Sequence, residues 1–331
     1  MLKGIKVVSV QEMARIEKGG DHERYMADAG RKVAEAVMRY VETHHLPKQA
    51  TLLVGKGNNG GDAYAAGICL LDEGYKVHSY PLYDDVSPLN QKFRERFWKK
   101  RGKFEAKIEG LIIDGLLGTG FKGKIEKKMA AVIELANASD SPIIAIDIPS
   151  GLNGTTGEIG GIAIVATETV ALGLPKIGFF IHQGWNFVGK LRIADFGLPK
   201  EAVAAAEAMA YLPKHLQLPK IARIRHKYQA GYVIGYAGSK VFPGAAKMTG
   251  LAALKAGAGI VRLYYPEEVG PVPIELICNE WDSESWKKAL TKAQAVFVGP
   301  GLGPALGWLK AHLKEIKQPC VIDADALQPS L

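Results

Sequence analysis

Cysteine is scarce in this sequence, and long hydrophobic runs are missing from it. The chain of 331 residues has three cysteines, Cys69, Cys278 and Cys320, which lie far apart and form no Cys-x-x-Cys pair. That pattern disfavours a disulfide framework and a zinc site, and it fits a reducing compartment. No run of about 18 apolar residues occurs, which is the length that a membrane span needs. Residues 1–6 also lack the apolar segment of a signal peptide. We therefore predict a cytoplasmic protein that does not enter a membrane.

A dense basic stripe is missing too. The sequence has 42 Lys+Arg against 34 Asp+Glu, a formal net charge of +8, but its basic residues are scattered in short runs such as Lys99–Arg101. This spread favours anionic ligands such as phosphates and disfavours a nucleic-acid partner. Hydrophobic residues at 47% and charged residues at 23% are typical of globular domains. At roughly 100–200 residues per domain, the length predicts two domains.

What the sequence does contain is an alternation of predicted helices and strands. Helical spacing of apolar residues runs from Val10 to Glu42. Short apolar runs then predict strands at 51–54, 76–80, 111–113 and 142–146, with helices at 63–73, 91–101 and 124–138. Shorter β-like segments follow at 162–165, 169–172 and 191–194. Such an alternation is typical of βαβ units in a doubly wound parallel sheet.

A second alternation begins near Gly231. It follows the stretch 198–218, whose prolines make it the best candidate for a linker. Strands are predicted at 232–234, 259–263, 295–298 and 320–322, together with a helix of small residues at 245–256. The sequence therefore predicts one α/β domain over residues 1–217 and a second over residues 218–331.

A glycine-rich segment follows the first buried strand. Residues 55–62 read Gly-Lys-Gly-Asn-Asn-Gly-Gly-Asp and lie between a predicted strand and a predicted helix. Backbone N–H groups in such a segment can approach an anionic or planar ligand, and a helix start favours negative charge. The segment is neither a Walker A loop nor a dinucleotide fingerprint, and a tight Asn-Gly turn is the alternative interpretation. We expect it to contact a ligand.

Two further strand ends carry polar side chains. Asp114 ends one predicted strand and is followed by Gly-Thr-Gly at 118–120, and Asp147 ends the next and is followed by Ser150. Taken alone, Asp114 could cap a helix and Asp147 could anchor a turn. In an open parallel sheet, however, ligands lie outside the carboxyl ends of the strands. The three strand ends together predict an active site with carboxylates, amides and a hydroxyl, and without a His or Cys nucleophile in these motifs.

These segments resemble the NAD(P)H-hydrate epimerases, and the resemblance spans about residues 5–200. It implies a Rossmann-like three-layer αβα domain that interconverts the R and S forms of hydrated NADH or NADPH. The epimerised centre would be the hydroxylated C6 of the nicotinamide ring. The motifs that carry the resemblance are residues 55–62, Ile-Asp-Gly-Leu-Leu-Gly-Thr-Gly at 113–120, Ile-Asp-Ile-Pro-Ser-Gly-Leu-Asn at 146–153, Thr169, Pro-Lys-Ile-Gly at 175–178, Ala-Asp-Phe-Gly-Leu-Pro at 194–199, and Tyr-Met-Ala-Asp-Ala-Gly at 25–30, where Ala27 replaces the usual Glu.

The resemblance also implies roles for individual residues. The substrate contacts that it implies are Asn58, Asn59, Gly60, Gly61, Asp62, Gly118, Thr119, Gly120, Phe121, Lys122, Gly123, Lys124 and Asp147. It places a potassium ion at Asn59, Asp114 and Ser150, and oxygen ligands of this kind suit a hard cation. For proton transfer at the carbinolamine carbon we expect Asp147 to act as general acid/base. Lys176 is a second candidate, and a solvated surface lysine is the alternative interpretation for it.

The second segment resembles the ADP- or ATP-dependent NAD(P)H-hydrate dehydratases, which have a ribokinase-like α/β fold. This resemblance covers about residues 222–331 and rests on motifs at 225–234, 243–246, 253–259, 298–303 and 321–327. Ala246 and Gly301 match positions that contact substrate in that family. The family's later motifs, among them a Gly-Gly-Ser/Thr-Gly-Asp with the catalytic Asp, do not occur in the sequence. We therefore expect only the first part of a ribokinase-like domain.

Epimerase activity without dehydratase activity is accordingly our main expectation. ADP or ATP would be used only if the missing dehydratase portion were supplied, and many members of the epimerase family form a homodimer. One alternative is a complete bifunctional epimerase/dehydratase of which this chain is a fragment. Another is a non-catalytic binding protein of the same fold, against which the retained polar residues at the three strand ends argue. A nicotinamide-dependent oxidoreductase is least favoured, because its dinucleotide fingerprint is missing.

Overall fold

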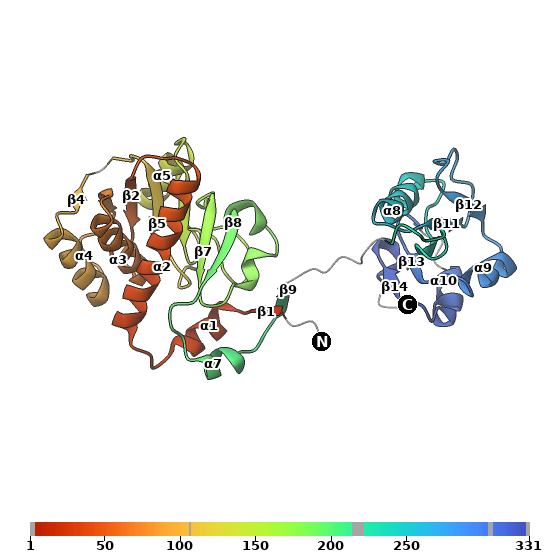
Figure 1. The fold of residues 1–331 in the computed structure, drawn as a ribbon, viewed down its shortest axis with the longest axis horizontal. Coiled ribbons are helices and arrows are strands. Elements are labelled where there is room, and N and C mark those ends of the chain that lie inside the picture. The colour runs from red at the N-terminus through yellow and green to blue at the C-terminus, as the bar shows by residue number, and fades with distance from the viewer. Residues whose placement is uncertain (1–3, 106, 214–221, 304–306, 329–331) are drawn as a thin grey trace. The chain divides into compact units, whose positions relative to one another are not determined.

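The computed structural model describes residues 4–105, 107–213, 222–303 and 307–328. The chain divides into two compact units, Met1–Gln217 and Leu218–Leu331, each with a sheet of its own (Figure 1). Within the described residues, no helix has both the length and the apolar character needed to cross a membrane.

A seven-stranded sheet forms the centre of the first unit (Figure 1). Neighbouring strands in it run parallel throughout. The order of the strands reverses at β2 and β5, so the carboxyl ends of these two strands border the crevice in which ligands of such sheets bind. The doubly wound parallel sheet is therefore confirmed. In spatial order the strands are β4 (Lys103–Phe104), β3 (Lys76–Pro81), β2 (Gln49–Val54), β5 (Leu111–Gly115), β6 (Ile143–Ile146), β7 (Glu168–Leu172) and β8 (Lys190–Ala194).

Helices cover both faces of this sheet. Side chains that succeed one another along a strand point to opposite faces. Leu52 and Val54 accordingly pack into the core formed with α2 and α3, whereas Leu53 packs into the core formed with Ile133 of α5. The expected three-layer αβα arrangement is confirmed. The helices on the first face are α2 (His22–Thr43), α3 (Asn58–Asp72) and α4 (Pro88–Lys99), and α5 (Lys127–Asn137) lies on the second.

The first predicted helix is interrupted. Helix α1 (Val10–Glu17) ends before residues 18–21, and α2 begins at His22. Gly19 has a φ of 82°, a left-handed conformation that glycine adopts without a steric penalty. Asp21 then caps α2 by accepting a hydrogen bond from the Arg24 N–H. The predicted helical spacing over 10–42 is therefore confirmed but divided between two helices, and the break leaves Glu17 at the end of a short helix.

The stretch predicted as a linker begins with ordered elements of the first unit. It contains α7 (Lys200–Ala204) and β9 (Ala210–Pro213), and β9 pairs antiparallel with β1 (Gly4–Val7). The linker prediction over 198–218 is therefore wrong for its first part, because a strand from the N-terminal end pairs with it. Residues 214–221 lie outside the described residues.

One predicted β-like segment forms no strand. At 162–165 the backbone bonds to a helix end and a loop instead, with the Val165 N–H donating to Oδ1 of Asn137, the last residue of α5, at 2.9 Å and the Ile164 N–H donating to the Ser150 carbonyl. The segments predicted at 169–172 and 191–194 are strands β7 and β8. The 3-10 helix η1 (Ile177–Phe179) and helix α6 (Trp185–Val188) connect them.

The second unit is a five-stranded parallel sheet between helices (Figure 1). Helix α8 packs on the face that carries Val261 and Leu263, and α9 packs through Trp286 on the face that carries Ile234. The predicted second α/β unit is therefore confirmed. Its strands in spatial order are β12 (Ile277–Glu280), β11 (Ile260–Tyr265), β10 (Tyr232–Tyr236), β13 (Ala295–Val298) and β14 (Cys320–Ile322), and its helices are α8 (Pro243–Lys255), α9 (Ser283–Leu290), α10 (Gly307–His312), η2 (Leu313–Glu315) and η3 (Ala324–Ala326).

Candidate active site

The glycine-rich segment is mostly the first turn of a helix. Helix α3 begins at Asn58, whereas the sequence predicted a helix from Ala63. Residues 58–62 are therefore helical, which corrects the expectation of a loop over 55–62. Gly60 and Gly61 lower the intrinsic helix propensity of this segment, but the close packing around it requires glycine at both positions. A Cβ on Gly60 would lie inside van der Waals contact of the Gly55 carbonyl oxygen, and one on Gly61 would lie 2.5 Å from Met26 Sδ.

Two residues that the sequence argument missed hold this segment in place. The Asn90 side chain is fully buried, and its Nδ2 donates to the carbonyls of Gly55 at 3.0 Å and Gly57 at 2.8 Å. The Ser87 hydroxyl donates to Asn58 Oδ1 at 3.0 Å. Ser87 also caps α4, and the Ser-Pro dipeptide at 87–88 is the signal that could have located this helix start. Nothing in the local sequence indicates that Asn90 is buried.

A cavity of about 150 Å³ lies beside the start of α3. It brings together six of the residues predicted to contact substrate, which come from three separate strand ends. The remaining predicted contacts in the first unit do not line the cavity, and their contact with substrate stays a prediction. The predicted residues that line it are Asn58, Asn59, Asp62, Gly118, Thr119 and Asp147, and the other lining residues are Glu17, His22, Tyr25, Met26, Ala29, Leu89, Leu172 and Phe196.

Asp147 lies at the end of β6 in an unusual backbone conformation. Its φ is 62°, in the left-handed region that Asp tolerates better than most residues. Strain of this kind costs about 1–3 kcal/mol and is concentrated at functional sites. The side chain is almost fully buried, and its Oδ1 accepts a hydrogen bond from the Leu172 N–H at 3.0 Å. The sheet therefore holds this carboxylate in one orientation at the cavity.

Lys176 forms a buried ion pair with Asp147. Its side chain has no exposed surface, and its Nζ contacts Asp147 Oδ1 and donates to the Leu172 carbonyl at 2.9 Å. The alternative interpretation of a solvated surface lysine is therefore wrong. A buried charge needs a partner of opposite sign, because desolvation alone would be costly. Asp147 and Lys176 form one charged unit at the edge of the cavity.

Two more carboxyl groups face the same cavity. Burial, followed by the negative charge of Asp147, raises the pKa of Glu17 to about 7, although Lys176 opposes the shift. Burial, followed by the charges of Asp147 and Glu17, raises the pKa of Asp62 well above its usual range. Glu17 was not among the predicted site residues. It is distant in sequence from the strand ends, and no local pattern distinguishes it from other helical glutamates.

The residues proposed as potassium ligands come together next to this cavity. Ser150 donates from its N–H to Asp114 Oδ2 at 2.8 Å and from its hydroxyl to Asp114 Oδ1 at 2.6 Å. The Leu117 N–H donates to Ser150 Oγ at 2.9 Å, and Asn59 Nδ2 donates to the Leu117 carbonyl at 2.7 Å. Asn59, Asp114 and Ser150 are thus linked through one backbone segment.

The chemistry of this group fits a hard monovalent cation. Asp114 has no exposed surface and forms no ion pair within the described residues, and burial raises its pKa to about 6 despite the hydrogen bonds from Ser150. A buried carboxylate without a cation is costly, and a bound cation would compensate its charge. The donors are carboxylate, amide, hydroxyl and carbonyl oxygens. In the described part of the chain, no group of three or more His, Cys, Asp or Glu side chains is arranged so that it could hold a metal ion by itself.

The rest of the Gly-Thr-Gly loop extends away from the cavity. Phe121 packs against Gly160, since a Cβ on Gly160 would overlap its ring. The Ile125 N–H donates to the Gly160 carbonyl at 2.9 Å, which anchors the end of the loop. Gly120, Lys122, Gly123 and Lys124 are exposed. Lys122 and Lys124 occupy positions where the epimerase family often has Arg. A phosphate there would therefore contact a lysine ammonium, which is a point charge, and not an arginine guanidinium, which can bind two phosphate oxygens at once.

The two predicted residues of the second unit also lie close together. Ala246 is buried in the first turns of α8, and Gly301 has a φ of 70° in the loop after β13. A Cβ on Gly301 would lie 2.6 Å from the Phe242 carbonyl oxygen and 2.9 Å from Ala245 Cβ. The close approach of this loop to the start of α8 thus needs glycine. Substrate contact at Ala246 and Gly301 stays a prediction.

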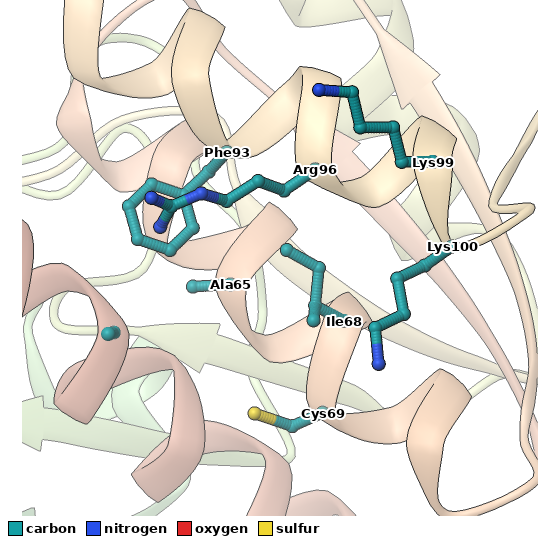
Figure 2. A pocket seen from close by; sticks show the side chains of 8 residues that line it. Ala65, Ile68, Cys69, Phe93, Arg96, Lys99 and Lys100 are labelled. Atoms are coloured by element: carbon teal, nitrogen blue, oxygen red, sulfur yellow. The ribbon is translucent and has the colours of Figure 1, made fainter.

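A larger cavity of about 500 Å³ opens elsewhere on the first unit, over α2, α3 and α4 (Figure 2). Its floor includes Ala65 and Ile68. Figure 2 shows Arg96 lying across the Phe93 ring, with its guanidinium carbon 4.9 Å from the ring centroid. Arg96 also pairs with Glu23 at 2.7 Å. None of the predicted site residues lines this cavity, and it lacks the perturbed carboxyl groups of the smaller one.

Known proteins resemble the chain along nearly its whole length. The bifunctional NAD(P)H-hydrate repair enzyme Nnr of Moorella thermoacetica is 30% identical over 366 aligned positions, which cover 97% of this chain and 69% of that enzyme. The chain belongs to the family of bifunctional NAD(P)H-hydrate repair enzymes. The family described as YjeF-related protein N-terminus matches residues 22–178, and the family described as NAD(P)H-hydrate dehydratase matches residues 233–330. The resemblances on which the sequence argument relied are therefore confirmed.

Solved structures also resemble parts of the chain. The yeast protein ynu0 superposes with a TM-score of 0.53 at 20% identity, over 62% of this chain and 96% of its own, and so shares the fold. The ADP/ATP-dependent NAD(P)H-hydrate dehydratase from Bacillus subtilis is 31% identical over 33% of this chain and 43% of its own, with a TM-score of 0.28. Both families of domain are present in the chain. That finding favours the alternative of a bifunctional enzyme over the expectation that dehydratase activity is absent.

Proposed function

We propose that the first unit is an NAD(P)H-hydrate epimerase domain that interconverts the R and S forms of hydrated NADH or NADPH. The observation that carries the proposal is the buried Asp147–Lys176 pair at a cavity whose walls also include Asn58, Asn59 and Asp62. Epimerisation of a carbinolamine needs a group that can accept or give a proton beside the reacting carbon. In this proposal Asp147 has that role, and the contact with Lys176 supports it by holding the carboxylate in position.

The remaining cavity residues support binding of the nicotinamide ring. The carboxamide of the ring has one donor and one acceptor group, which side-chain amides such as Asn58 can match. Tyr25 and Phe196 also line the cavity, in edge-to-face contact with ring centroids 5.3 Å apart. An aromatic and amide lining of this kind suits a planar ring that carries one amide. The exposed Lys122 and Lys124 are our candidates for contact with the dinucleotide's phosphates.

We further propose that Asn59, Asp114 and Ser150 hold a potassium ion in the epimerase site. When bound, the ion would compensate the buried Asp114 charge and help to orient the substrate. The loop that carries Gly118 and Thr119 is tied to this group through Leu117. Potassium therefore supports catalysis indirectly in this proposal, by fixing a loop that lines the cavity.

The test of the epimerase function is a direct assay. The chain is mixed with purified R-NADHX, and the S form is followed by chromatography in potassium buffer and in a buffer with a bulky organic cation. We expect conversion to the equilibrium mixture, faster in potassium. Conversion no faster than the uncatalysed rate in either buffer would reject the epimerase proposal, and equal rates in the two buffers would reject the potassium site alone.

For the second unit we propose the N-terminal portion of a dehydratase domain, in a bifunctional enzyme of which this chain is part. The match to the dehydratase family and the identity to the ADP/ATP-dependent relative support nucleotide use there. The corresponding test adds ADP or ATP to the chain with S-NADHX and follows the return of NADH absorbance. Recovery of NADH supports dehydration by this chain, and no recovery would limit its activity to epimerisation.

A further inference from the structure

Three carboxyl side chains face one small cavity from three different elements. Glu17 is the last residue of α1, Asp62 lies near the start of α3, and Asp147 follows β6. Within the described residues Asp147 has a cationic partner in Lys176, whereas Glu17 and Asp62 form no ion pair. Three carboxylates around about 150 Å³ with one buried ammonium cannot all be ionised without strong repulsion.

The surroundings of Glu17 determine which group keeps a proton. The charged side chains that face it are Asp147 and Lys176 on one side and Asp62 on another, and His22 and Tyr25 of α2 line the same cavity. Burial and Asp147 together raise the pKa of the Glu17 carboxyl to about 7. At neutral pH a large fraction of Glu17 is therefore a neutral acid beside the ion-paired carboxylate of Asp147. Acid–base catalysis needs such a pair, in which one carboxyl group can give a proton and the other can accept one.

We propose that Glu17 is the catalytic acid that complements Asp147 in the epimerisation, an inference that rests on the epimerase function proposed above. The Glu17 carboxyl gives its proton to the hydroxyl on C6, the C–O bond breaks, and water leaves while the lone pair of the ring nitrogen forms a C=N bond. Water then adds to the other face of C6, the C=N pair returns to nitrogen, and Asp147 takes the released proton. The step ends with Glu17 ionised and Asp147 protonated, and the reverse epimerisation begins from that state.

Asp62 has a different role in this scheme. Burial and the neighbouring charges of Asp147 and Glu17 raise the pKa of Asp62 well above its usual range, which favours its neutral form. A general acid works best when its pKa lies near the working pH. Asp62 therefore acts as a fixed hydrogen-bond donor to the substrate, and Glu17 is the group that exchanges its proton.

The test compares the pH dependence of R-to-S conversion in the full chain and in three carboxyl-to-amide variants. Glu17→Gln removes the exchangeable proton while it keeps the size of the side chain. Asp62→Asn removes the other neutral carboxyl group of the cavity. Glu95→Gln is the matched control, because Glu95 is exposed on α4 and does not line the cavity.

We expect the wild-type kcat/KM, which reports the free enzyme, to fall as pH rises through about 7, because the acid form of Glu17 is lost. Glu17→Gln should lose about 10²–10⁴-fold in kcat, the usual contribution of a general acid, with KM changed less than about threefold. Its remaining rate should no longer fall around neutral pH. Asp62→Asn should raise KM and keep the decline, and Glu95→Gln should match the wild type.

Two results would overturn the inference in distinguishable ways. If the wild type converts R-NADHX but Glu17→Gln retains both its rate and the decline near neutral pH, Glu17 is not the acid, and the epimerase function stands. If the wild type shows no conversion, the proposed function fails and this role fails with it. A second measurement is independent of activity: the ¹³C carboxyl resonance of Glu17, identified by its loss in Glu17→Gln, should titrate near 7. Titration near the ordinary value for glutamate would contradict the proposal.

Discussion

At the scale of single residues, the site depends on one buried ion pair. Asp147 and Lys176 are both removed from solvent, and each compensates the charge of the other. The loss of one partner leaves an unpaired buried charge, whereas the loss of both does not. The pair therefore couples the stability of the first unit to the chemistry of its cavity.

This coupling can be measured as a double-mutant cycle. Lys176→Met leaves Asp147 buried without a cation, so we expect it to lower the free energy of unfolding by about 3–5 kcal/mol. Asp147→Asn combined with Lys176→Met should be more stable than Lys176→Met alone. Urea denaturation of the four proteins, followed by circular dichroism, gives the coupling energy. Additive losses would show that the two side chains do not interact.

The raised pKa of Glu17 predicts a pH dependence of stability. Because the folded state binds a proton on Glu17 more tightly than the unfolded state, the contribution of this group to stability is fully present below the ordinary glutamate pKa of 4.5 and is lost as pH rises through about 7. Glu17→Gln should make this part of the profile flatter and should stabilise the protein relative to wild type at pH 8. Thermal midpoints of both proteins between pH 5 and 8 test this sign. A parallel decline in the two proteins would contradict it.

The sequence allowed site residues to be predicted where they lie just after a strand. Asp114, Asp147 and Ser150 come directly after buried apolar runs, and the carboxyl ends of parallel strands mark where ligands bind. Glu17 and Asn90 reach the same site from helices distant in the sequence, and only the tertiary packing brings them there. The sequence around each of these residues therefore does not indicate that it belongs to the site.

At the scale of elements, the start of α3 is the most constrained feature of the site. Helix α3 packs against α2 through Gly61 and against the preceding loop through Gly60. The sequence argument treated these glycines as signs of a loop, because glycine disfavours helices. The packing requirement outweighs that propensity, which is why the predicted helix start was five residues too late.

Substitution of these glycines tests this explanation. Gly60→Ala forces a methyl group against the backbone carbonyl of Gly55, which cannot move as a flexible side chain would. We expect a loss of about 1–3 kcal/mol in unfolding free energy, typical of overpacking. Gly120→Ala is the matched stability control, because no atom lies within 4 Å of its added Cβ. Equal denaturation midpoints for the two variants would contradict the packing argument.

Other elements show which parts of the fold a local pattern can predict. The strands β2, β5 and β6 were located closely, because buried parallel strands are largely continuous apolar runs. The pairing of β1 with β9 was not predicted, since it joins two short segments from opposite ends of the first unit. The split between α1 and α2 was missed because apolar spacing continues across it, although Gly19 and Asp21 supply the ordinary stop and start signals.

At the scale of the whole molecule, two α/β units with parallel sheets match the two families found in the chain. The alternation of strands and helices was enough to predict both units, because it is a property of sequence order. The functional division between them is a stronger claim. That claim depends on whether the first unit catalyses the proposed epimerisation in its cavity. The contribution of the second unit is measured separately, through nucleotide-dependent recovery of NADH.

The most direct test of the central claim is the rate at which the full chain converts R-NADHX to S-NADHX, measured beside Asp147→Asn. Asparagine tolerates the φ of 62° at this position, so the variant should keep the backbone conformation. Because it leaves the buried Lys176 charge unpaired, its fold is compared with that of the wild type by circular dichroism before the assay. The account predicts conversion by the wild type and a loss of about 10²–10⁴-fold in the variant, the usual contribution of a general acid or base. Undiminished conversion by Asp147→Asn, or none by the wild type, would contradict it.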